Sequence, residues 1–146
     1  MVQHTAFFQS TNMFSDTKRK KGCKWFSLKY EFSNEWTTKA RELCTKLEMN
    51  HVKLERVSCV KSFGTKTRRT IARIHTIGKV LQLGMQTEPF YVIELISEKF
   101  DKQSEQDQTK TLIHELMHIP HSFGGGFRGH KGYVNEKMVE KEFKKL

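Results

Sequence analysis

The segment from Thr111 to Pro120 limits how this chain can fold more than any other part of the sequence. It contains the pattern His114-Glu115-Leu116-Met117-His118, and the apolar residues Leu112, Ile113 and Ile119 flank the two histidines. Side chains four positions apart in an α-helix lie one turn apart on the same face. A helix here therefore places two imidazoles side by side, and its apolar residues require burial against the rest of the domain.

Two imidazoles at this spacing are typical ligands of a catalytic zinc ion. Such a site has three protein ligands and one open position, and its His nitrogens lie about 2.0–2.1 Å from the metal. Glu115 lies between His114 and His118, where it binds no metal but can accept the proton of a metal-bound water. The pattern predicts one Zn²⁺ per chain, and Glu115 favours a hydrolytic site over a purely structural one.

The helix is predicted to begin at a capping box and to end near Pro120. Ser104 stands three residues before Asp107, which occupies the place usually held by Glu or Gln. Proline disfavours helical geometry at the residue before it, so Ile119 should close the helix. In the extended HExxHxxGxxH pattern the third His falls six residues after the second, and Gly124 occupies that position here.

The third metal ligand must therefore come from another residue after the helix. His121 directly follows the proline and is not expected to point back at the metal. The run Gly124–Gly126 permits a sharp reversal, which can fold His130 back over the helix end. We predict His130 as the third ligand, and Glu136 and Glu140 are the carboxylate alternatives.

A hydrolytic site also needs a hydrogen-bond donor for the developing oxyanion. Arg128 and Tyr133 lie close to His130 in the sequence and are the two candidates. Either side chain can equally serve in a salt bridge or in packing.

Apolar periodicity predicts a mixture of helices and strands in the rest of the chain. Ser33 should begin a helix in which Trp36, Ala40, Leu43 and Leu47 share a face. The other predicted elements are a strand over His51–Val60, a turn at Gly64, a strand followed by a helix or a bulged hairpin over Thr70–Leu83, a strand over Phe90–Ile96, and a closing helix over Tyr133–Leu146 that carries Val134, Met138 and Phe143 inward.

Length and composition indicate one intracellular domain. The chain has 146 residues, no apolar run of the roughly 18–20 residues that span a bilayer, and no apolar signal-peptide core at its start. Its three cysteines form no CxxC pair, which suits a reducing compartment. We therefore expect a cytoplasmic protein that does not associate with a membrane.

The positive charge is concentrated away from the histidine motif in the sequence. The net charge is +10, and residues 1–100 hold 18 Lys and Arg against 9 Asp and Glu. Residues 1–28 include the run Lys18-Arg19-Lys20-Lys21 and are expected to form a basic, flexible arm. A second, acid-free stretch supplies the candidate nucleic-acid contacts, which are Lys61, Lys66, Arg68, Arg69 and Arg73. Alternatively, both stretches are only charged surface exposed to water. The identity of any partner is then a question separate from the metal chemistry.

Several motifs resemble those of the small predicted metallopeptidases found mainly in archaea and their viruses, a minimal zincin-like group. The shared segments are Ser62-Phe63-Gly64, Arg68, Ala72-Arg73-Ile74, Tyr91-Val92-Ile93-Glu94, Phe100-Asp101, Leu112–Pro120, Phe123, Gly125-Gly126, Arg128 and His130. The resemblance covers residues 29–146 and leaves the basic arm outside. It implies a zincin-like α+β fold with a small mixed sheet packed on the HExxH helix and flanking helices, and it implies His130 as the third ligand.

Two functional hypotheses follow. The first is a zinc metallopeptidase that hydrolyses protein or peptide substrates with Glu115 as general base. The second is a nucleic-acid-associated protein that uses the basic region 61–79. A protease tethered to DNA would combine both.

Overall fold

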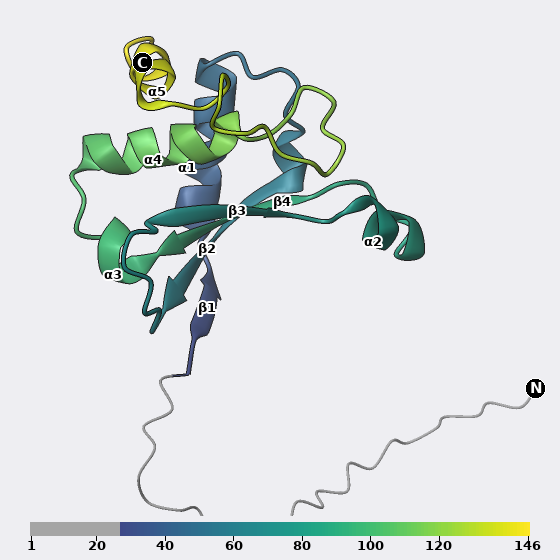
Figure 1. Cartoon of the computed structure of the whole chain (residues 1–146), viewed down its shortest axis with the longest axis horizontal. Coiled ribbons are helices and arrows are strands. Elements are labelled where there is room, and N and C mark those ends of the chain that lie inside the picture. The colour runs from purple at the N-terminus through teal and green to yellow at the C-terminus, as the bar shows by residue number, and fades with distance from the viewer. Residues whose placement is uncertain (1–26) are drawn as a thin grey trace, which may run out of the picture.

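The computed structural model describes residues 27–146, so the basic run of the predicted arm lies outside the described residues. The described chain is an α+β domain (Figure 1), which confirms the predicted fold class. Its elements are β1 (Lys29–Phe32), α1 (Asn34–Lys46), the 3₁₀ turn η1 (Leu54–Arg56), β2 (Val57–Phe63), β3 (Ala72–Thr76), α2 (Lys79–Gly84), β4 (Tyr91–Ile96), α3 (Ser97–Phe100), α4 (Glu105–Met117) and α5 (Glu136–Phe143).

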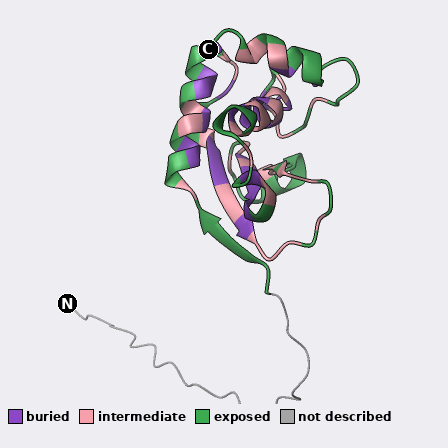
Figure 2. Cartoon of the chain, turned by 90° about the vertical axis from the view of Figure 1, so that its left-hand side faces the viewer, coloured by how far each residue is buried: buried purple, intermediate pink, exposed green. Residues whose placement is uncertain are grey.

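The four strands form a small mixed sheet in the order β1-β2-β4-β3. β2 and β4 are parallel, with Val57 opposite Tyr91, whereas β1 and β3 run antiparallel to their neighbours. The strands β1 and β3 are therefore the edges. β1 is exposed along its whole length (Figure 2), while β4 is largely buried in the centre.

One hydrophobic core joins the sheet to α1 and α4, which lie on the same side of it (Figure 1). Alternate residues of β2 and β4 point into this core because successive side chains of a strand face opposite sides. The fully buried members include Val57, Cys59, Ile93, Leu95, Leu112, Ile113 and Leu116. The apolar face of the histidine-bearing helix is thus covered by the sheet and by α1.

The starts of α1 and α4 agree with their sequence signals. Ser33 is the N-cap of α1 and accepts a hydrogen bond from the Trp36 N–H (3.4 Å). Ser104 caps α4 and accepts from the Asp107 N–H (3.2 Å). The helix ends at Met117, two residues before the predicted limit.

Other boundaries differ from the prediction. The strand predicted over His51–Val60 begins only at Val57, because residues 54–56 form a 3₁₀ turn, and it continues to Phe63. The segment Thr70–Leu83 is a strand followed by a helix, which settles the choice against a hairpin. No helix in residues 27–146 is long and apolar enough to cross a membrane.

The last helix is shorter than predicted, and Met138 does not face inward. Asn135 is its N-cap, so the helix begins at Glu136. Val139 and Phe143, four residues apart, share the inner face of this helix. Met138 is 38% exposed, whereas Val139 is buried.

Candidate metal centre

Three imidazoles meet at the end of α4. The Nε2 atom of His114 lies 3.2 Å from Nε2 of His130 and 3.3 Å from Nε2 of His118. One nitrogen from each of the three rings lies within 4.8 Å of the others. The structure therefore brings together two residues one helical turn apart and a third that follows the glycine run.

The backbone determines which nitrogen of His118 faces this cluster. Its Nδ1 lies 2.6 Å from the carbonyl oxygen of Arg128. A carbonyl can only accept, so Nδ1 carries the hydrogen and Nε2 keeps its lone pair. A hydrogen bond of this kind orients the imidazole of a metal ligand and raises its basicity.

The environment of His114 and His118 favours the neutral form of both rings. Burial, followed by the charges of His118 and His130, lowers the pKa of His114 to about 4. Burial is also the largest cause of the lowered pKa of His118. Neutral imidazoles whose lone pairs face one point repel each other unless a cation or protons lie between them. The cluster therefore has the chemistry of a cation-binding site.

Glu115 places a carboxyl group in the same cleft. Its side chain is largely buried, and burial raises the pKa of the carboxyl group to about 7. A group with this pKa can accept and release a proton near neutral pH.

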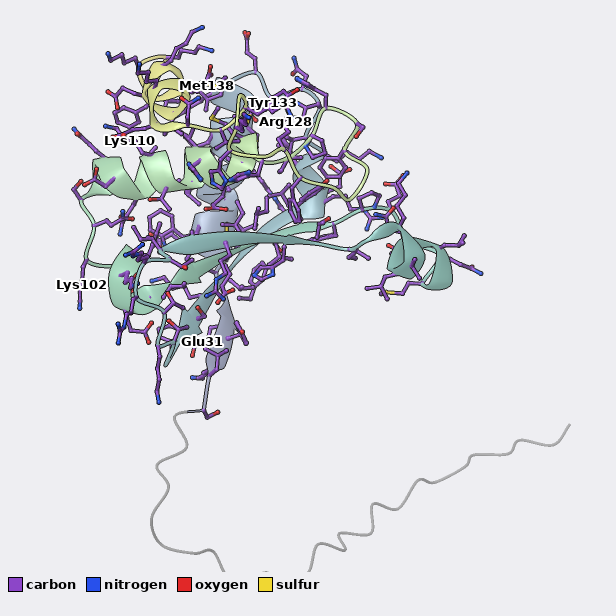
Figure 3. The ribbon with its side chains drawn as sticks, in the orientation of Figure 1. Glu31, Lys102, Lys110, Arg128, Tyr133 and Met138 are labelled. Atoms are coloured by element: carbon purple, nitrogen blue, oxygen red, sulfur yellow. The ribbon has the colours of Figure 1, made fainter. Side chains whose placement is uncertain are left out.

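The cleft beside the three histidines has a volume of about 1010 Å³. Its walls come from the segment leading into β3, from α4, from α5 and from the loop before His130. The lining residues include Arg69, Ile74, Thr111, Glu115, Phe127, Arg128, Glu136 and Glu140. The Nη2 atom of Arg128 is buried without a hydrogen-bond partner among the described residues. Tyr133 is exposed and is not part of the lining (Figure 3).

The other candidate ligands lie elsewhere or are engaged. The ring of His121 packs against that of His51, with 4.4 Å between the ring centroids. Glu140 forms a salt bridge to Lys110 (2.7 Å) that connects α5 to α4. Glu136 lines the cleft but does not belong to the imidazole cluster.

The loop that delivers His130 is held by residues that the sequence did not single out as functional. The hydroxyl of Tyr91 donates to the Gly126 carbonyl (3.0 Å) and accepts from the Gly125 N–H (3.0 Å). The side-chain amide of Gln82 donates to the Gly124 carbonyl (3.2 Å). One chemical signal in the sequence could have pointed to Tyr91, because a tyrosine in a buried strand needs a hydrogen-bond partner for its hydroxyl group.

The basic stretch of the sequence is not remote from the metal centre in space. Arg69 and Arg73 contribute to the lining of the cleft, so the separation of positive charge and histidine motif along the sequence does not hold in space. Lys61 is paired with Asp101 (2.7 Å), and Arg73 lies 3.9 Å from Glu94. Distance along the sequence did not predict this arrangement, because β3 is an edge strand of the sheet that packs against α4.

The α+β fold and the imidazole cluster define a candidate metal-binding domain built on an HExxH helix. A protein-family model described as "Putative phage metallopeptidase" matches residues 28–145. The chain therefore belongs to this metallopeptidase family. No curated protein and no solved structure matches it.

Proposed function

We propose that this protein is a zinc-dependent metallopeptidase in which His114, His118 and His130 hold the metal. The observation that carries the proposal is the convergence of three imidazoles beside a buried carboxyl group in one cleft. Three nitrogen ligands suit Zn²⁺ and leave one coordination position for water or substrate. One such ion per chain would use all three imidazoles as ligands.

Glu115 is the proposed general base. When bound, zinc supplies Lewis acidity, which lowers the pKa of a water molecule toward about 7 and polarises a carbonyl group. Glu115 accepts the proton of the attacking water and returns it to the amine leaving group. The raised pKa of its carboxyl group, caused by burial, suits both transfers near neutral pH.

Of the two proposed donors for the oxyanion, Arg128 has the stronger support. It lines the cleft, and its Nη2 atom has no partner among the residues that the structure describes. Tyr133 is exposed and outside the lining, so its side chain would have to move to reach a substrate.

The position of β3 supports an extended peptide as substrate. β3 is an edge strand that pairs with β4 in the described sheet, and residues 69–74 line the cleft. The outer edge of such a strand presents unpaired N–H and C=O groups, to which an extended chain can add as a further strand. A peptide bound in this way lies directly beside the three histidines.

Metal analysis and one substitution test the proposal. Purified protein should contain about one zinc per chain. Glu115→Gln should keep the zinc and lose peptide hydrolysis by about 10²–10⁴-fold, because only proton transfer is removed. Glu35→Gln, at an exposed position on α1, is the matched control and should keep full activity. Undiminished cleavage by Glu115→Gln, or a folded protein that binds no metal, would refute the proposal.

A further inference from the structure

Two neighbouring segments at the end of the sheet that lies far from α2 carry four cationic residues. Arg68 and Arg69 belong to the loop between β2 and β3, Lys99 belongs to α3, and Lys102 follows that helix. The loop and α3 lie side by side in Figure 1, and Lys102 points away from the body of the protein in Figure 3. We call these four residues the loop–α3 patch.

Hydrogen bonds hold the loop and α3 together as one surface. The N–H of Gly64 donates to the carboxylate of Glu98 on α3. The Lys99 ammonium lies 3.5 Å from the hydroxyl of Thr67. The patch is therefore a defined surface formed by two segments about 30 residues apart in the sequence.

The positive charge of the patch is only partly offset by the carboxylates that lie beside it in residues 27–146. None of its four cations has a carboxylate oxygen within 4.0 Å in residues 27–146, whereas Lys61, Arg73 and Lys110 each have one. Two carboxylates lie beside the patch. Backbone hydrogen bonds are the largest cause of the lowered pKa of Glu98, and the charge of Lys102 is a further cause. Asp101 binds Lys61 and Ser97, and Glu98 accepts from Gly64. Like charges held close together repel, and an anionic partner would relieve this repulsion.

We propose that the loop–α3 patch binds the phosphate backbone of nucleic acid. Arginine forks match phosphate oxygens, and lysine adds point charges. The exposed large apolar side chains of α2 lie at the other end of the sheet, and the four residues of the patch are all cationic, which favours a phosphate backbone over a membrane surface.

The patch borders the proposed peptidase cleft. Arg69 belongs to the patch and also lines the cleft. Nucleic acid bound here would lie beside the cleft, and a protein bound to the same nucleic acid would be presented to it. The binding step itself requires no metal, so it can be tested separately from hydrolysis.

The test measures binding of the full chain to a labelled duplex DNA of about 20 base pairs, and to a single strand of the same length, over 50–300 mM salt. The double variant Arg68→Ala/Lys102→Ala avoids the residue shared with the cleft. We expect at least about tenfold weaker binding near 100 mM salt. The plot of log K against log salt should be shallower by about 1.8, since each lost phosphate contact contributes about 0.9.

The matched control is Lys137→Ala/Lys141→Ala, which removes the same charge from exposed positions on α5. It should bind with the slope of the unmodified chain, and circular dichroism melts should show that both variants fold. Equal losses in the two variants would overturn the proposal, because binding would then follow net charge or another segment. Failure of the full chain to bind either DNA, or tighter binding to phosphatidylserine vesicles, would also overturn it.

Discussion

His118 and Arg128, ten residues apart, are joined by a pair of hydrogen bonds. The imidazole Nδ1 of His118 lies 2.6 Å from the Arg128 carbonyl oxygen, and the Arg128 N–H donates to the His118 carbonyl (2.8 Å). The end of α4 and the loop that follows it are therefore positioned together. Because the same loop delivers His130, contacts that hold the loop also determine the geometry of the imidazole cluster.

Tyr91→Phe should weaken metal binding without unfolding the protein. The substitution removes the hydroxyl that binds Gly125 and Gly126, and leaves the Gly125 N–H and the Gly126 C=O without that partner. Loss of a group that helps to position a metal ligand typically lowers metal affinity by about 10–100-fold. Zinc competition with a chromogenic chelator measures the effect. Tyr30→Phe, at an exposed position on β1, should change nothing, and equal affinity in both variants would contradict the role of Tyr91.

Substitution of the histidines separates the proposed ligand from its sequence neighbour. His130→Ala should lower zinc affinity by at least about 100-fold, because a three-nitrogen site loses one ligand. His121→Ala should retain the affinity, since the ring of His121 packs on His51 instead. Calorimetric zinc titration of both variants tests this. A loss only in the His121 variant would assign the third ligand to that residue.

Gly125→Ala should destabilise the protein by about 2 kcal/mol or more. Gly125 has φ +86°, and an added Cβ would approach the Ile77 carbonyl oxygen to 2.6 Å and also collide with the Gln82 amide. A strained backbone position alone costs roughly 1–3 kcal/mol. Gly126→Ala is the control, because its Cβ would meet no atom within 4 Å. Urea denaturation of the two variants should show a clearly lower midpoint only for the first.

The buried thiols predict a dependence of stability on alkaline pH. Burial raises the pKa of Cys44 and of Cys59 from the ordinary 9.0 to about 12. A raised pKa in the folded state means that the protonated thiols contribute stability below pH 9, and that this contribution is lost as the pH rises toward 12. Urea midpoints should therefore fall between pH 9 and pH 11.

Alkylation gives a direct check of the same two thiols. At pH 8.5 the folded protein should keep Cys44 and Cys59 unmodified by iodoacetamide, because the thiolate is the reactive form and both groups are buried. In 6 M guanidinium both should react, as peptide mass spectrometry can show. Rapid modification of either residue in the folded protein would contradict the burial.

Local sequence signals were sufficient for the helix that bears the HExxH motif. Ser104 caps it, its apolar face has helical periodicity, and Pro120 follows its end. These signals act between residues at most four positions apart, so the sequence alone contains them. The start of β2 was predicted less well, because Leu54 fits the strand alternation yet belongs to a 3₁₀ turn.

The arrangement of the site depended on contacts between distant parts of the chain. Residue spacing excluded the extended HExxHxxGxxH pattern, because Gly124 occupies the position of its third His, and it favoured His130 as the third ligand. The meeting of the three imidazoles, however, requires a loop that is held by Tyr91 from β4 and Gln82 from α2. Likewise, the sheet order β1-β2-β4-β3 brings Arg69 to the cleft beside a helix some 40 residues later. The sequence therefore determined the helix, two of the imidazoles and the proposed base, because short-range periodicity encodes them. Only tertiary packing decided the third imidazole and the neighbours of the cleft, because these positions depend on strand pairing and loop closure over tens of residues.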